Sequence, residues 1–378
     1  MQILILNWRD IRSPRAGGAE VLTHEIAKRL ALRHRVTWLS SRVDGQQAEE
    51  EIDGVRVIRR GSEATTRFFA PAFARATHWD VVIEEINTLP YFAPVWSHAP
   101  TMLFIPQLAR DVWWYEAPRM LAWPGWAAEP LYLAAYRRVN AITISDSTCT
   151  DLRRFGLREH IDVLPMAVST PALTQLAPKK PTGQLVAVGR LVPSKRFDHA
   201  LRALSSLRES HVSASLTVIG EGRDRTKLEH LAEQLGLGEA VHFTGRVTEE
   251  TKVGLLEQAD VLVACSVREG WGLTTTEAAR LGTPAVGYDV PGLRDSIIDE
   301  RTGLLTKPSP LALAEGVRRL LDDHEYYDSL RRAAWARWRE VSWDRTATSF
   351  ERALLSAVSP EGTRSRAVQA HTRAGAGR

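Results

Sequence analysis

Short apolar runs alternate with segments of helical spacing along most of the chain. Residues 2–7 carry an apolar run of the kind found in buried strands, and apolar side chains recur every three or four residues through 19–32. Further strand-like runs, with helical segments between them, occur at 36–40, 55–59, 81–85, 101–105, 141–145, 162–164, 185–189, 215–220, 241–244, 261–264 and 284–287. This alternation predicts an α/β protein with mostly parallel sheets covered by helices.

A stretch of linker composition divides the chain into two such halves. Residues 168–182 carry three prolines among lysines and small polar residues. The pattern therefore predicts two doubly wound domains at 1–170 and 183–343, a linker at 171–182, a final helix at about 344–357 that completes the first domain, and a disordered tail at 358–378. Open parallel sheets bind ligands at the carboxyl ends of their strands, so we expect the site in a cleft between the domains.

Composition and charge exclude several classes of protein. Of 378 residues, 44% are hydrophobic and 25% are charged, and the net charge is +4, which is typical of a soluble globular protein and less basic than most nucleic-acid binders. Two cysteines and the absence of a basic leader predict a reduced cytoplasmic protein without disulfides. No apolar run approaches the roughly 18 residues of a membrane span.

The stretch 265–284 carries the strongest functional signal. It follows a strand-like run and enters a predicted helix through a turn that contains Gly270 and Gly272. Glycines let the backbone approach a ligand, and the start of a helix offers unpaired N–H groups and a positive dipole end, so we expect a phosphate there. Glu269 and Glu277 flank this anion site. Their carboxylates suit hydroxyl groups, so the turn predicts a diphosphate with a sugar on either side.

Two cations lie on the turn after the strand-like run 185–189. The planar guanidinium of Arg190 can donate two parallel hydrogen bonds to phosphate oxygens, and the ammonium group of Lys195 adds a compact positive charge. Together the two residues can bind a diphosphate. An exposed basic pair is more often only a solvated surface. Its combination with Glu269 and Glu277 favours the diphosphate.

Gly17 and Gly18 form a second glycine turn, directly before the first predicted helix. They allow another backbone approach to phosphates, although a glycine pair is about as often a simple tight turn. The pattern G-x-G-x-x-G is missing here, and Gly220-Glu-Gly222 is followed by Arg225 where a third glycine is needed, so we expect no nicotinamide or flavin cofactor. No His-x-x-x-His pair and no Asp-x-Asp occurs, so we expect no metal ion either.

Several blocks resemble family 4 of the retaining glycosyltransferases. In chain order they are Gly189-Arg190 with Lys195, Gly220-Glu-Gly222, Phe243-Thr-Gly245, and Glu269-Gly-Trp-Gly-Leu273 through Glu277-Ala278. The resemblance covers about residues 1–357 and is more specific in the second half. It implies the GT-B architecture, in which two Rossmann-like domains face each other across a cleft.

The resemblance also implies roles for these residues. Arg190 and Lys195 would hold the diphosphate of a nucleotide diphosphate sugar, which is the donor substrate. Glu277 would bind the ribose hydroxyls, and Glu269 would contact the transferred sugar, which makes Glu269 a predicted catalytic residue together with the two cations. The remaining donor contacts would come from Val247, next to the base, and from the backbone of Gly270, Trp271, Gly272 and Leu273.

On the amino-terminal half, the resemblance implies that Gly17 and Gly18 close on the diphosphate. We expect the acceptor on the same half, where the candidate residues are Asn87, Gln107, Arg110, Trp113 and Trp114. Members of the family often place a histidine after the strand that corresponds to 101–105, whereas this chain has Pro106 followed by Gln107.

Two stretches of the first half mix aromatic and charged residues. Four tryptophans lie within 113–126, and they suit stacking on sugar rings or a membrane interface, with packing of an irregular segment as an equal alternative. The stretch 56–75 could dock on an anionic membrane, although a solvated face is the more common meaning of such a pattern. This stretch mixes Arg59, Arg60, Arg67 and Arg75 with Phe68, Phe69 and Phe73.

The sequence thus predicts a cytoplasmic bacterial enzyme that moves a hexose-type sugar from a nucleotide diphosphate sugar to an acceptor hydroxyl with retention of configuration. The acceptor is a sugar, a lipid-linked or a small molecule, as in cell-envelope, polysaccharide or glycoconjugate synthesis, and the inner face of the membrane is an alternative location. Two other functions stay open. A nucleotide-sugar epimerase of the same fold would turn over donor without acceptor, and a catalytically silent binding protein, which Pro106 keeps open, would release no nucleotide.

Overall fold

The computed structural model describes residues 1–210 and 213–358, and these form two compact units. The first unit comprises Met1–Ala109, Ala127–Ala167 and the described residues from Ser342 on, and the second comprises Arg110–Trp126 and Val168–Val341. The predicted disordered tail, 358–378, lies outside the described residues except for Val358, which ends the last helix.

The first unit contains an eight-stranded sheet in the order β3-β4-β2-β1-β5-β6-β7-β8. All neighbouring strands are parallel except β3 and β4. The chain leaves β1 toward β2 and leaves β5 toward β6, so the carboxyl ends of β1 and β5 form a topological switch point. The strands are β1 (Gln2–Leu6), β2 (Arg35–Ser40), β3 (Glu49–Ile52), β4 (Val55–Arg59), β5 (Val81–Glu85), β6 (Thr101–Phe104), β7 (Asn140–Thr143) and β8 (Ile161–Val163).

Helices cover this sheet, and the last helix of the chain returns to it. Arg29 Nε on α1 lies 2.6 Å from Asp344 Oδ1 on α14, and His34 Nε2 lies 2.7 Å from Glu351 Oε1. Phe350 of α14 also packs edge-on against Phe104 of β6. The helices are α1 (Gly18–Leu30), α2 (Thr66–Arg75), α3 (Ala93–Trp96), η2 (Ala134–Tyr136), α6 (Asp146–Arg154), α14 (Trp343–Val358) and the second half of α5 (Arg119–Leu133), whose first half belongs to the second unit.

The second unit contains a six-stranded parallel sheet in the order β11-β10-β9-β12-β13-β14. Here β9 and β12 are neighbours from which the chain departs in opposite directions, so their carboxyl ends form the switch point of this unit. The strands are β9 (Gln184–Val188), β10 (Ser215–Ile219), β11 (Val241–Gly245), β12 (Val261–Ala264), β13 (Ala285–Tyr288) and β14 (Gly303–Thr306).

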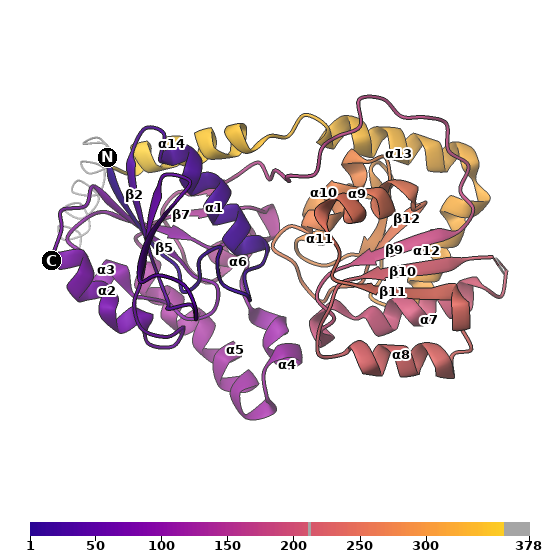
Figure 1. Ribbon diagram of the computed structural model, residues 1–378, viewed down its shortest axis with the longest axis horizontal. Helices are drawn as coiled ribbons and strands as arrows, with labels where there is room; N and C mark the ends of the chain where they lie inside the picture. The colour runs from indigo at the N-terminus through magenta and orange to yellow at the C-terminus, as the bar shows by residue number, and fades with distance from the viewer. Residues whose placement is uncertain (211–212, 359–378) are drawn as a thin grey trace, which may run out of the picture. The chain divides into compact units, whose positions relative to one another are not determined.

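Two apolar clusters pack on the two faces of the second sheet. Leu201 of α7 and Leu228 of α8 belong to one cluster, and Leu256 of α9 and Ala278 of α10 belong to the other. In Figure 1, α7 and α8 accordingly lie on the opposite side of β9 and β10 from α9 and α10. The helices are η1 (Arg110–Val112), α4 (Trp113–Glu116), η3 (Pro193–Lys195), α7 (Phe197–Leu207), α8 (Arg225–Gln234), η4 (Gly238–Ala240), α9 (Glu249–Gln258), α10 (Leu273–Arg280), α11 (Leu293–Ser296), α12 (Pro310–Asp322) and α13 (His324–Trp338).

The α/β class and the two parallel-sheet domains are therefore as the sequence predicts. Three features differ in detail. The charged run of β3 forms an antiparallel edge strand, β14 adds a sixth strand to the second sheet, and the tryptophan-rich segment 110–126 is helical rather than irregular and groups with the second unit.

Candidate functional site

The two motifs of the second half start at the switch point of the second unit. Arg190 follows β9 and Glu269 follows β12, and these two strands are neighbours in the sheet. Open α/β sheets bind ligands at such a point. The topology therefore brings together two turns that lie far apart in the sequence.

The structure places Lys195 and Glu269 in direct contact. Lys195 Nζ donates to Glu269 Oε1 in an ion pair, and Ser266 Oγ donates to the same oxygen at 2.6 Å. The sequence pattern predicts that the lysine binds the diphosphate and the glutamate the sugar, but it indicates neither this pair nor Ser266. An anion that binds at this turn must compete with Glu269 for the ammonium group.

Arg190 is exposed and makes no ion pair with another residue in the described ranges. It therefore remains available to a ligand, in contrast to Lys195. The predicted loop Gly220-Glu-Gly222 packs directly against this turn, because a Cβ on Gly220 would lie 1.9 Å from the carbonyl oxygen of Gly189 and one on Gly222 would lie 2.2 Å from that of Leu191. Close packing of the two loops thus accounts for these two glycines.

The turn before α10 depends on Gly272. Its φ of 88° lies in the left-handed region, and a Cβ there would approach both Leu293 and Ser296 to 3.0 Å. Thr275 accordingly fixes the first turn of α10, since its hydroxyl donates to the carbonyl oxygen of Gly272 at 2.6 Å. This geometry directs the backbone N–H groups at the start of α10, beginning at Leu273, toward the carboxyl end of the sheet.

Trp271 turns its side chain inward. The side chain is buried, its Nε1 donates to Thr276 Oγ1 at 2.9 Å, and its ring meets that of Trp338 edge to face at 5.5 Å. Only the backbone of Gly270 and Trp271 is therefore left to serve a ligand, which agrees with the backbone role that the resemblance implies.

Glu277 faces Lys252 of α9. Lys252 Nζ lies 3.1 Å from Glu277 Oε1 and 2.8 Å from Glu249 Oε2. Burial raises the pKa of Glu277, and the charge of Lys252 opposes that shift. Sequence reasoning missed Lys252, although its helix follows the predicted base-binding loop. In that loop, Val247 packs against the same apolar cluster as Leu256.

At the switch point of the first unit, the predicted residues meet a buried polar cluster. Gly17 donates its backbone N–H to Glu20 Oε2 at 2.7 Å, so the glycine turn already has a carboxylate partner. Asn87 Nδ2 donates to Asn7 Oδ1 at 3.1 Å and to Glu85 Oε1 at 3.2 Å. Sequence reasoning missed Asn7 and Glu85, although both stand at the carboxyl ends of neighbouring strands.

Glu85 is fully enclosed in this cluster. Its Oε2 accepts hydrogen bonds from Asn7 Nδ2 at 2.7 Å and from Thr23 Oγ1 at 2.5 Å. Burial raises the pKa of Glu85 to about 8, despite these donors. Gln107 lies farther along this edge, next to Pro106, whose carbonyl oxygen accepts from Thr148 Oγ1 at 3.5 Å.

The three remaining acceptor candidates lie in the segment 110–126. The guanidinium of Arg110 stacks on Trp126 at 4.6 Å, and the ring of Trp113 packs so tightly on Gly125 that a Cβ there would come within 2.7 Å of it. Trp114, by contrast, is 48% exposed. Packing therefore accounts for Trp113, whereas Trp114 is open to solvent.

The basic and aromatic stretch 56–75 likewise contains both buried and exposed residues. Arg59 is buried and forms a bidentate ion pair with Asp10, with Nε at 2.8 Å from Oδ2 and Nη2 at 3.0 Å from Oδ1, so the expectation of an exposed Arg59 is wrong. Phe73 packs against the core of the first unit. Phe68 and Phe69 of α2 are exposed, at 75% and 47%.

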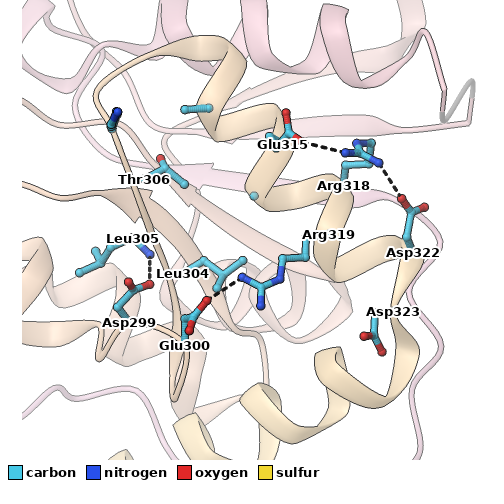
Figure 2. A pocket seen from close by; sticks show the side chains of 13 residues that line it. Asp299, Glu300, Leu304, Leu305, Thr306, Glu315, Arg318, Arg319, Asp322 and Asp323 are labelled. Carbon is cyan, nitrogen blue, oxygen red and sulfur yellow. Dashed lines mark hydrogen bonds and ion pairs between the residues drawn. The ribbon is translucent and has the colours of Figure 1, made fainter.

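A groove of about 650 Å³ lies elsewhere, between β14 and α12 (Figure 2). Its arginines are already engaged, since Arg319 pairs with Glu300 at 2.8 Å and Arg318 with Glu315 at 2.8 Å. None of the predicted site residues lines it. Among the residues that the structure covers, no group of three or more His, Cys, Asp or Glu side chains could hold a metal ion, and no helix is long and apolar enough to cross a membrane.

Two family models match the chain, and together they span most of it. The model of "Glycosyl transferases group 1" matches residues 172–337, and that of "Glycosyltransferase Family 4" matches residues 16–171. Glycogen synthase of Mycobacterium tuberculosis is 29% identical in an alignment of 404 positions that covers 94% of this chain and 95% of that protein. The GDP-mannose-dependent alpha-(1-6)-phosphatidylinositol dimannoside mannosyltransferase of the same species is 36% identical over 167 residues, 44% of this chain and 42% of that protein.

Solved structures resemble the whole chain at lower identity. HepE of Anabaena, solved in complex with UDP and glucose, superposes with a TM-score of 0.72 at 17% identity and covers 94% of this chain and 100% of its own. WaaG, a glycosyltransferase involved in lipopolysaccharide biosynthesis, superposes with a TM-score of 0.72 at 20% identity and covers 93% of this chain and 98% of its own. At these identities the likeness shows the fold alone.

Proposed function

The chain belongs to family 4 of the glycosyltransferases and has their GT-B architecture, and from this premise we propose that it transfers a hexose-type sugar from a nucleotide diphosphate sugar to an acceptor hydroxyl with retention of configuration. One observation carries the proposal. The exposed cation Arg190, the pair Lys195–Glu269 and the start of α10 meet at one switch point. Cations and helix N–H groups at one place suit a diphosphate, and a carboxylate beside them suits sugar hydroxyls.

The chemistry asked of these residues is mainly electrostatic. The bond between the anomeric carbon and the phosphate oxygen breaks, the acceptor oxygen bonds to that carbon on the same face, and the departing phosphate oxygen takes the acceptor's proton. Negative charge therefore grows on the diphosphate in the transition state. Arg190, Lys195 and the N–H groups of α10 are fixed in advance to stabilise it, so we expect no requirement for a metal ion.

Glu277 and Glu269 divide the donor between them in this proposal. Glu277, charge-balanced by Lys252, would accept hydrogen bonds from the ribose, and Glu269 would accept them from the transferred sugar. The acceptor, whether a sugar, a lipid-linked or a small molecule, would bind near Asn87 of the first unit, and Trp114 of the second unit is a separate candidate contact. The exposed Phe68 and Phe69 of α2 support an additional contact with a membrane surface.

A donor and acceptor assay tests the function. UDP-glucose and GDP-mannose, the donors suggested by the names of similar proteins, are incubated with and without a mixture of sugar and lipid-linked acceptors. We expect nucleotide release that depends on acceptor, and NMR of the product should show the anomeric configuration of the donor. Turnover of the sugar without acceptor and without nucleotide release would indicate an epimerase. Donor binding with no release under any condition would indicate a silent binding protein, and an inverted product would refute retention.

A further inference from the structure

Arg196, directly after the predicted diphosphate ligand Lys195, has a strained backbone. Its φ of 49° and ψ of 45° lie in the left-handed region, which residues other than glycine rarely adopt. Such a conformation persists only where the surrounding structure holds it, and it often occurs at functional sites. Lys195 therefore lies on a turn, η3, whose exit needs an external support.

The support comes from α4 of the segment 110–126. Arg196 Nη2 donates to the hydroxyl of Tyr115 at 2.6 Å, and the guanidinium lies 5.3 Å from the centre of the Tyr115 ring. The hydroxyl and the ring of one aromatic side chain thus both contact the guanidinium. A hydrogen bond to a charged group is also among the stronger ones in proteins.

The next residue of α4 holds the other end of the same turn. Glu116 Oε1 accepts the backbone N–H of Ser194 at 3.1 Å, while its Oε2 lies 3.2 Å from Arg223 Nη2. Arg223 Nη2 also donates to the carbonyl oxygen of Tyr115 at 3.1 Å. The residues on both sides of Lys195 are therefore tied to two consecutive residues of α4.

The segment itself is stiffened from within. The Trp113 ring lies against Gly125, and Arg110 both stacks on Trp126 and donates through Nη1 to its carbonyl oxygen at 3.1 Å. These contacts close α4 and the start of α5 into a packed hairpin. A stiff hairpin can hold a strained turn, whereas a loose loop could not.

We infer that Tyr115 is a positioning residue for the donor site, which through Arg196 holds Lys195 in the conformation that binds the donor's diphosphate. This inference rests on the proposed function, since it concerns the binding of the donor's diphosphate by Arg190 and Lys195, the diphosphate clamp. It assigns to the tryptophan-rich segment a part in donor binding, in addition to the acceptor side on which the sequence alone placed it. Tyr115 acts on Lys195 and need not touch the donor.

Removal of one oxygen atom tests this role. Tyr115→Phe keeps the ring but loses the hydroxyl that accepts from Arg196, and we expect UDP and GDP to bind about three- to tenfold more weakly by calorimetry. Arg196→Gly removes the strain, because glycine adopts the left-handed region freely, and should bind both nucleotides within about twofold of the wild type. Met120→Ala, in the same hairpin at a side chain that is 88% exposed, is the matched control and should change nothing.

The double variant separates positioning from direct contact. With Arg196→Gly in place, Tyr115→Phe should have no further effect on nucleotide affinity, because the strain that Tyr115 opposes is gone. An equal loss in both backgrounds would overturn the inference, since Tyr115 would then act on the ligand itself. A loss of thermal stability in Tyr115→Phe with unchanged affinity would overturn it as well. So would a large loss of affinity in Arg196→Gly alone.

Lys195→Ala distinguishes this inference from the proposed function. If Lys195→Ala binds UDP and GDP as the wild type does, the diphosphate clamp of the proposed function fails. If Lys195→Ala binds weakly while Tyr115→Phe binds normally, the clamp stands and only the role of Tyr115 is refuted.

Discussion

The ion pair between Lys195 and Glu269 leads to the prediction that removing the charge of Glu269 increases nucleotide affinity. In the unliganded chain Glu269 competes with the diphosphate for the Lys195 ammonium group. Glu269→Gln removes the competing charge, because it replaces the carboxylate with a neutral amide of the same size. We therefore expect this variant to bind nucleoside diphosphate more tightly than the wild type while it turns over more slowly, because the contact to the transferred sugar is weakened.

The magnitude follows from the setting of the pair. The side chains of Lys195 and Glu269 are 24% and 19% exposed, so the pair is partly screened by solvent. Exposed ion pairs contribute about 0.2–1 kcal/mol, and the upper part of that range fits a half-buried pair that Ser266 supports. Release of Lys195 should thus tighten nucleoside diphosphate binding by about two- to fivefold.

Calorimetry with UDP and GDP measures this effect directly. Because the gain depends on Lys195, it should vanish when Glu269→Gln is combined with Lys195→Ala. Glu277→Gln is the contrasting variant, and it should weaken binding, since Glu277 is assigned to the ribose. If Glu269→Gln weakened nucleotide binding as much as Glu277→Gln does, the assignment of the two carboxylates would be wrong.

Three further predictions follow from single residues. Arg190→Ala should weaken nucleoside diphosphate binding by about 1.5–3 kcal/mol without lowering the melting temperature, since Arg190 is exposed and unpaired within the described ranges; equal affinity by calorimetry would remove it from the clamp. Burial raises the pKa of Glu85 from 4.5 to about 8. Between these two pH values the folded state keeps a proton that the unfolded chain releases. The free energy of unfolding should therefore fall as pH rises through this window, by up to about 1.4 kcal/mol per pH unit. Urea unfolding at several pH values should show a shallower fall of stability in Glu85→Gln than in the wild type, since Glu84 and Glu277, whose pKa values burial also raises, remain in both. Trp338→Ala should cost about 3–5 kcal/mol of unfolding free energy, because Trp338 is buried against Trp271, and a cost under about 1 kcal/mol would contradict that packing role.

The sequence carried enough information for the fold because its strands are mostly buried on both faces. Such strands appear as continuous apolar runs, and the helices between them show helical spacing. β3 was missed for a physical reason. Its sequence Glu-Glu-Glu-Ile has no apolar pattern, and its charges are neutralised across the edge, where Glu49 pairs with Arg56 at 3.1 Å and with Arg60 at 3.0 Å.

The candidate site was predictable in location but not in its internal pairing. The carboxyl ends of β9 and β12 could be found from the sequence, because each is followed by a glycine-containing or cationic turn. Lys195 and Glu269 are 74 positions apart in the sequence. No local sequence pattern predicts which loops contact each other at the carboxyl ends of the strands. The same holds for Arg59, which local charge placed at the surface and which its bidentate pair with Asp10 keeps buried.

The geometry of parallel sheets explains why the pairings that the sequence does not predict lie at the carboxyl ends of the strands. In a parallel sheet, every strand delivers its following loop to the same end of the sheet, so charged residues that are distant in sequence can become neighbours there. A charge on such a loop can therefore face solvent, a ligand or another loop with the same local sequence. Arg190 and Lys195 illustrate the point. They lie five residues apart on one turn, yet Arg190 is exposed without an ion-pair partner among the described residues, whereas Lys195 is held by Glu269. A ligand that binds both must displace a partner from only one of them, and the opposite effects expected for Glu269→Gln and Arg190→Ala on nucleotide affinity are the measurable consequence of that asymmetry.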